Sequence, residues 1–257
     1  MITLAHTWHM TMRHLRNLSR QPWYIAFTLL QPVIYLLLFG SLFRRVTDLP
    51  GFDTGSYITF FTPGIVVMSA LFGAGWSGMG VIIDLDRGVL DRFLVSPASR
   101  VALLAGRLVH QAAVTVIQSA IIVVLGLIVG AQFPNGLLGV VVLIGCAILL
   151  AAPFSALSIG IALLARKQES VIGTVNLVQM PLTFLSSVFM AQGLMPEWMQ
   201  GIAVFNPVNW AVQAGREALA ANVDWGLVLS RAEYLLAFAI VCGWLATLSF
   251  RAYQRAV

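Results

Sequence analysis

The chain has 257 residues, of which 59% are hydrophobic and 10% are charged, and its formal net charge is +5. Soluble globular proteins carry roughly 25% charged residues, so this composition excludes an ordinary soluble domain. The basic residues are spread over the ends of apolar segments instead of forming one patch, which argues against nucleic-acid binding. Several uncharged runs reach the about 20 residues that a membrane-crossing helix needs. The sequence therefore predicts an all-α membrane protein whose single transmembrane domain fills residues 1–257.

Residues 1–21 predict a helix that lies on the membrane surface. Apolar side chains recur there at helical spacing, and a basic stripe with Arg13, Arg16 and Arg20 occupies another face. This pattern is typical of an interfacial helix against anionic lipid. A helix that packs on a partner protein is the alternative interpretation.

Six apolar segments follow, and each predicts a transmembrane helix: 23–43, 57–83, 108–131, 137–164, 170–190 and 234–250. Six crossings place both termini on the same side of the membrane. Of the fifteen basic residues, eleven then fall on the side of the termini, and the other side has four, which are Arg44, Arg45, Arg216 and Arg231. Because cytoplasmic loops are enriched in Lys and Arg, we expect a multi-pass cell-membrane protein with both termini in the cytoplasm.

Residues 84–107 form a charged segment between two membrane-length uncharged runs, so this segment, with the loop 84–100 in it, must lie in water at a membrane face. In a helical projection, apolar side chains cover one half of the surface and charged side chains cover most of the other half. Pro97 ends this short helix. The pattern predicts an amphipathic helix between the second and third spans that binds a soluble partner. A lipid-facing surface helix is the alternative.

The second predicted span contains the pattern G-x-G-x-x-G, from Gly73 to Gly78. This pattern binds dinucleotides only between a strand and a helix of a βαβ unit. Within an apolar span, and with Ala70 and Ala74 at helical spacing from Gly78, it instead predicts close packing of helices.

Sequence motifs for catalysis and nucleotide binding are missing. The phosphate-binding pattern G-x-x-x-x-G-K-[ST] does not occur, and glycine does not precede Lys167, which is the only lysine. We therefore expect no enzyme activity, cofactor or metal in this chain. The predicted spans are also poor in ionisable groups, of which His110 is the clearest. Ion-coupled transporters usually carry such groups at mid-membrane, so any transport would need an outside source of energy.

Residues 191–233 differ from the rest because tryptophans, prolines and scattered charges interrupt the apolar pattern. The uncharged stretch from Gly201 to Gly215 is too short to cross a membrane. We expect re-entrant or external helices there, between the fifth and sixth spans.

Two motifs, in this order along the chain, carry a family resemblance. The first is LDRFLVSPASR, with Leu94, Pro97 and Arg100 at its end, and the second is FNPVNW, followed by Arg216. With six spans and this length, the whole chain resembles the type-2 ATP-binding-cassette exporter permeases, including the daunorubicin-resistance permeases.

The resemblance implies a dimer, here expected to be a homodimer, that works with two separate ATPase subunits, which hold ATP and Mg. It implies that the loop after the second span docks on the ATPase as a coupling helix, through Leu85, Arg87, Leu90, Asp91, Arg92, Phe93, Leu94 and Pro97. It also implies a substrate path along the dimer interface, for which spans 2 and 5 offer Phe60, Phe61, Met68, Phe72, Gly73, Met180 and Phe184. The segment before the last span is expected to form an external cap with Asn206, Pro207, Trp210 and Arg216.

Three functions are compatible with these features. The first is export of a small amphipathic drug-like or lipid-like molecule, which the apolar residues of spans 2 and 5 favour. The second is export of a polysaccharide or lipid-linked glycan by the same architecture. The third is a membrane anchor or sensor with no transport role.

Overall fold

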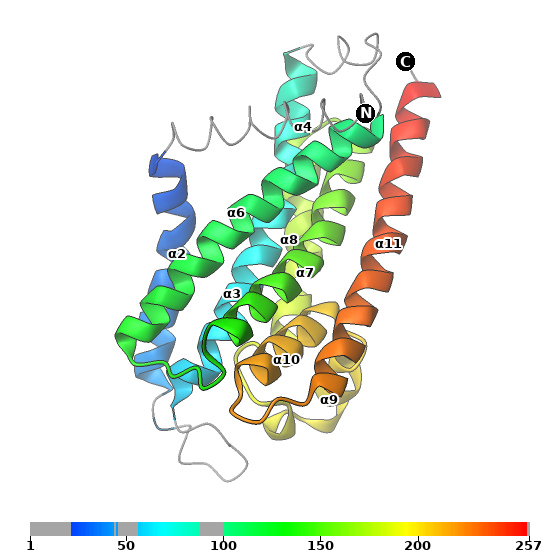
Figure 1. The fold of residues 1–257 in the computed structure, drawn as a ribbon. Helices are drawn as coiled ribbons and strands as arrows, with labels where there is room; N and C mark the ends of the chain where they lie inside the picture. The colour runs from blue at the N-terminus through cyan, green and yellow to red at the C-terminus, as the bar shows by residue number, and fades with distance from the viewer. Residues whose placement is uncertain (1–21, 44, 46–55, 88–99, 256–257) are drawn as a thin grey trace.

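A computed structural model describes residues 22–43, 45, 56–87 and 100–255, and every regular element in this part of the chain is helical (Figure 1). The elements are α2 (Pro22–Leu42), α3 (Tyr57–Gly75), α4 (Ser77–Asp86), α6 (Arg100–Val129), α7 (Gly136–Ala165), α8 (Gln168–Phe184), the 3-10 helix η2 (Gln192–Leu194), α9 (Glu197–Ala203), α10 (Pro207–Leu219) and α11 (Trp225–Arg255).

The long helices form one bundle (Figure 1). The start of α2, the end of α4 and the end of α11 lie at one end of the bundle, and α9 and α10 lie at the other. Among the described residues, four helical stretches are long and apolar enough to cross a membrane: Tyr57–Asp86, Gly106–Val129, Gly136–Ala165 and Trp225–Ser249. The protein is therefore membrane-embedded, as the composition predicts.

α3 supplies much of the core. Phe61, Ile65 and Leu71 of this helix have no exposed surface, and they pack in one apolar cluster with residues of α6, α7 and α10. Helix α7 packs against α3 on one side and against α11 on another. These contacts hold α3 in place between α6, α7 and α10.

The second predicted span differs from expectation because it is broken. Residues 57–83 were expected to form one continuous helix, whereas a turn at Trp76 separates α3 from α4. The hydroxyl of Ser158 in α7 enters this turn, where it accepts a hydrogen bond from the amide of Gly78 and donates one to the carbonyl of Gly75. A polar side chain inserted into the backbone ladder is a known cause of helix kinks.

The predicted close packing of the glycine segment is confirmed. A Cβ atom at Gly75 would lie 2.5 Å from Val175 Cγ1 of α8, and one at Gly78 would overlap the backbone of Ser158. Glycine thus lets α7 and α8 approach the broken helix on its two sides.

The last helix begins at Trp225, nine residues before the predicted start at 234. Asp224 precedes this helix, and its carboxylate accepts hydrogen bonds from the amides of Gly226 and Leu227, at 2.9 and 3.2 Å. Such a capping residue starts a helix irrespective of hydropathy. Charged Arg231 and Glu233 in the first turns hid this start from the hydropathy pattern.

Two other boundaries also differ from the predicted spans. α6 begins at Arg100, eight residues before the predicted start at 108. The predicted start was too late because the first turns of α6 contain charged side chains, which a membrane span excludes. α8 ends at Phe184, six residues before the predicted end at 190, and the turn that follows contains Ser186 and Ser187.

Candidate functional site

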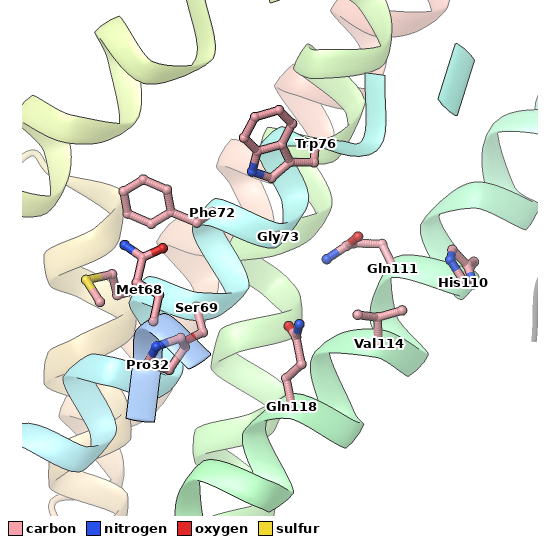
Figure 2. Close-up of a pocket in the computed structure, with 11 residues that line it drawn as sticks. Pro32, Met68, Ser69, Phe72, Gly73, Trp76, His110, Gln111, Val114 and Gln118 are labelled. Carbon is pink, nitrogen blue, oxygen red and sulfur yellow. The ribbon is translucent and has the colours of Figure 1, made fainter. Parts of the chain in front are cut away.

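A cavity of about 160 Å³ lies between α2, α3 and α6 (Figure 2). Its lining combines apolar and polar side chains: Gln31, Pro32, Met68, Ser69, Phe72, Gly73, Trp76, His110, Gln111, Val114 and Gln118. In Figure 2 the side chains of Gln111 and Gln118 extend from α6 toward α3. The cavity therefore has a carboxamide wall on α6, which faces Gly73, and an aromatic and methionine wall made by side chains that project from the other side of α3 (Figure 2).

Gly73 allows the two walls to approach each other. A Cβ atom at this position would lie 3.3 Å from Gln111 Nε2 and 3.6 Å from Gln118 Oε1. Ser77 donates to Gln111 Oε1 and Gln111 Nε2 donates to Thr115, each at 3.4 Å. Both bonds are longer than the usual about 2.9 Å, so the carboxamide of Gln111 is held only weakly by its neighbours.

The structure brings together part of the predicted substrate path. Met68, Phe72 and Gly73 line this one cavity. Phe61 is fully buried in the core and lines none of the cavities described here. Met180 on α8 has 56% of its surface exposed.

Phe184 belongs to a different cavity, of about 430 Å³, between α2 and the segment that follows α8. Tyr35, Phe39 and Phe189 line it as well, together with three methionines, Met190, Met195 and Met199. Phe184 and Phe189 stack with ring centroids 5.4 Å apart. Phe184 and Met68 thus lie in separate cavities, whereas the ring of Phe61 lies 5.8 Å from that of Phe189.

The predicted coupling residues Leu90, Asp91, Arg92, Phe93, Leu94 and Pro97 lie outside the described residues, as does the interfacial helix predicted for residues 1–21. Leu85 is half-buried and packs against an apolar cluster of α4, α7 and α8, and Arg87 is exposed.

The two helices that flank this segment are joined by an ion pair. Arg107 of α6 pairs with Asp84 of α4, and its Nη2 atom also donates to the carbonyl of Gly80 at 3.5 Å. The end of α4 and the start of α6 are therefore held together next to the predicted coupling segment.

At the opposite end of the bundle, asparagines tie α10 to the end of α8. Asn206 caps α10 by accepting from the amide of Val208, and it donates to the carbonyls of Leu182 and Leu185 at 2.7 and 3.0 Å. Pro207 occupies the first turn, where its missing N–H costs no hydrogen bond. Trp210 donates from its indole to the carbonyl of Val204 at 2.6 Å.

Arg216 joins α10 to two other segments. Its Nε donates to the carbonyl of Phe60 at 3.0 Å and its Nη2 to that of Val188 at 3.1 Å. The guanidinium carbon lies 3.5 Å from the centroid of the Phe60 ring, which is cation–π geometry. Burial lowers the pKa of Arg216 to about 9, so this side chain still carries its charge at neutral pH.

The sequence alone did not single out three glutamines and one asparagine that make contacts between helices. Gln111, Gln118 and Gln179 were not singled out because the sequence was searched for ionisable groups within the spans, and glutamine is uncharged. Uncharged polar residues in apolar helices were the available signal. Asn209 lies within the FNPVNW motif, and its side chain accepts from the amide of Ser187 at 3.0 Å.

The fold and the cavity define a helical membrane protein with a mixed polar and aromatic site between its helices, and sequence comparison gives its family. Residues 5–220 match the family described as ABC-2 type transporter. The chain belongs to the ABC-2 type transporter family.

Relatives within this family are named as permeases. The chain is 33% identical over 239 residues to the daunorubicin resistance ABC transporter permease protein DrrB1 of Streptomyces coeruleorubidus, which covers 91% of this chain and 82% of the relative. It is 30% identical to the putative transport permease ycf38 of Cyanophora paradoxa, over 77% of this chain and 68% of the relative. It is 24% identical to the probable doxorubicin resistance ABC transporter permease protein DrrC of Mycobacterium tuberculosis, over 83% and 76%.

Proposed function

We propose that this protein is the permease subunit of an ATP-driven exporter that moves a small amphipathic, drug-like or lipid-like molecule out of the cell. Membership of the ABC-2 family implies an ATPase partner. In the proposed assembly two copies of this chain form the membrane part, and two separate ATPase subunits bind ATP and Mg.

The proposed topology has six crossings, made by α2, α3 with α4, α6, α7, α8 and α11. The beginning of α2 and the end of α11 lie at the same end of the bundle, which supports termini on one side of the membrane (Figure 1). The excess of basic residues supports the cytoplasm as that side. Residues 84–100 then face the cytoplasm as a coupling helix, and α9 and α10 lie outside as the cap.

The observation that carries this proposal is the cavity in a chain of this family. Met68, Phe72 and Trp76 provide apolar and aromatic surface, and the glutamines of α6 provide hydrogen bonds. An amphipathic molecule has both kinds of surface. The names of two relatives include daunorubicin and doxorubicin, which supports a drug-like cargo.

The test is transport by the purified permease with its cognate ATPase in sealed liposomes. Daunorubicin is fluorescent, so its movement across the liposome membrane can be followed. We expect it to accumulate, only when ATP is present, in the compartment that faces the external side of the reconstituted protein. The matched control is the same preparation with an ATPase that binds ATP but cannot hydrolyse it. Transport of a lipid-linked glycan instead of the drug would establish the alternative cargo. ATP-dependent transport of neither molecule would refute an export function.

A further inference from the structure

The cavity between α2, α3 and α6 gathers polar side chains inside a bundle of apolar helices. Gln31 comes from α2, Ser69 from α3, and His110, Gln111 and Gln118 come from α6. The chains of lipids offer no hydrogen-bonding groups, so polar side chains that face them lose hydrogen bonds. A molecule that binds in this cavity is therefore expected to carry hydrogen-bonding groups of its own.

The position of the cavity along α3 places it deep in the membrane. A rise of 1.5 Å per residue puts Ser69 about 18 Å, and Gly73 about 24 Å, from the start of α3 at Tyr57. The hydrocarbon core of a bilayer is about 30 Å thick. If α3 and α4 cross the membrane as proposed, the cavity lies within this core.

The cavity is larger than a water site. Its volume of about 160 Å³ is roughly ten times the 10–15 Å³ that a single water requires on the same kind of measure. It therefore has room for a group of one or two rings.

The two walls match the two halves of such a group. Phe72 of α3 and Trp76 of the turn that follows it lie four residues apart and offer ring faces for stacking. Gln111 and Gln118 offer carboxamides, which both donate and accept hydrogen bonds. The 3.4 Å bonds of Gln111 are weak enough for a ligand to replace them.

The lining also discriminates by charge. None of the described residues that line the cavity is Asp, Glu, Lys or Arg. A charged group buried there would have no ionic partner from this lining, and isolated charges are strongly disfavoured in apolar surroundings.

We propose that this cavity binds one uncharged, ring-bearing group, either a whole molecule or the ring portion of a larger one, whose ring stacks on Phe72 and Trp76 and whose carbonyl or hydroxyl bonds to Gln111 and Gln118. Gln31 and Trp76 are exposed at the mouth, so the molecule enters from the lipid between α2 and α6. Binding is independent of the proposed function, and only the role of the bound molecule as cargo rests on it.

This site includes Met68, Phe72 and Gly73, which were expected on the substrate path, but it opens toward α6 and not toward α8. Gly73 faces the glutamines of α6, whereas Gly75 faces Val175 and Gln179 of α8. A path along spans 2 and 5 would use the α8 side. The proposed site is formed within one protomer, before any contact with a second copy.

The test is photolabelling of the full-length protein in lipid nanodiscs with benzophenone, without ATPase or nucleotide. Benzophenone is uncharged, has two rings and a carbonyl, and inserts into nearby C–H bonds on irradiation. We expect saturable labelling, mapped by mass spectrometry to the peptide that contains Met68. Gly73→Leu fills the cavity and is expected to abolish the saturable component.

Two further variants serve as a control and as an independent test of the glutamines. Gly243→Leu on α11 is the matched control, because nothing lies within 4 Å of a Cβ atom at Gly243, and it is expected to label like the wild type. The double variant Gln111→Leu, Gln118→Leu adds no bulk to α3 and is expected to weaken labelling roughly ten-fold by loss of two hydrogen bonds. This double variant decides the result if Gly73→Leu does not fold.

Labelling could instead rise linearly with benzophenone concentration and stay the same in the Gly73 and glutamine variants. This result would mean that the probe only partitions into lipid, and it would overturn the proposal. Saturable labelling at Met68 by a protonated aminomethyl analogue would overturn its restriction to uncharged ligands. Saturable benzophenone labelling without ATP-driven transport refutes the proposed function and supports this site. Transport without saturable labelling refutes the site alone.

Discussion

Ser158 and Gly78 are joined by a hydrogen bond of 3.0 Å, from the amide of Gly78 to the hydroxyl of Ser158. The same hydroxyl donates to the carbonyl of Gly75, so one side chain of α7 satisfies backbone groups on both sides of the break between α3 and α4. Trp76, which lines the cavity, sits in this break. Ser158 therefore connects the cavity to α4, which leads into the predicted coupling segment.

Replacing Ser158 with alanine is expected to destabilise the protein. The change leaves an amide and a carbonyl without this partner in a buried environment, at about 1–3 kcal/mol for each group that stays unsatisfied. Thermal unfolding in detergent should show a lower midpoint than the wild type. Ser155→Ala is the matched control, because Ser155 is buried one turn earlier on α7 and its hydroxyl has no partner among the described residues. Equal midpoints for the two variants would contradict the role of Ser158.

Gly78→Ala is expected to prevent normal packing of α4 on α7. The added methyl group would overlap the backbone of Ser158, which cannot move aside as a flexible side chain could. Gly173→Ala on α8 meets nothing within 4 Å and is expected to be neutral or to stabilise by up to about 1 kcal/mol through helix propensity. The yield of monodisperse protein in size-exclusion chromatography distinguishes the two. A Gly78→Ala protein as well behaved as Gly173→Ala would rule out the close approach.

Arg216→Lys is expected to lower stability although the charge is kept. Lysine cannot reproduce the two directed bonds to Phe60 and Val188 or the stacking on the Phe60 ring, and hydrogen bonds of charged groups contribute about 1.5–3 kcal/mol. Arg231→Lys is the comparison, since the guanidinium of Arg231 lies 5.8 Å from the Tyr234 ring centroid and makes the looser contact. Unfolding midpoints that fall by the same amount in both variants would argue against a special role for Arg216.

The coupling segment is tested by co-purification of the ATPase. Burial of a phenylalanine side chain is worth roughly 1.5–3 kcal/mol, so Phe93→Ala is expected to weaken the ATPase contact about ten-fold or more. Arg87→Glu is expected to weaken it through charge, with an effect that falls at high salt because salt screens exposed charges. Retention of the ATPase by both variants at two salt concentrations would favour a lipid-facing helix.

The topology is tested by labelling of single cysteines with a reagent that does not cross membranes. The native cysteines, Cys146 and Cys242, are both buried and are first replaced, so that the only reactive thiol is the one introduced. A cysteine at Ser99 is expected to react only from the cytoplasm and one at Asn222 only from outside. External reaction at Ser99 is the outcome that the coupling-helix interpretation does not survive.

The fold class followed from composition and hydropathy, because a charge-poor chain with membrane-length runs has few other solutions. The family followed from the two motifs and their order. Close packing at Gly75 and Gly78 was also predictable, since small residues at helical spacing serve this purpose in membranes.

The break at Trp76 and the helix ends were not predictable by the same route. The break depends on Ser158, which lies 80 positions along the chain from Gly78, and local pattern contains no such information. The start of α11 depends on a cap at Asp224, whereas hydropathy responds to Arg231 and Glu233. Met68, Phe72 and Gly73, which line the cavity, were among the residues expected on a substrate path, but the glutamines of its α6 wall are uncharged and a search for charge passes over them.

The contacts of Arg216 have a consequence for the order of assembly during synthesis. Phe60 and Val188 leave the ribosome before Arg216 does, so their carbonyls are already in place when the guanidinium arrives. Until then neither carbonyl accepts a hydrogen bond from Arg216. Helix α10, which carries Arg216, therefore makes these two bonds only after α3 and α8 have been synthesised, and its end of the bundle is completed late.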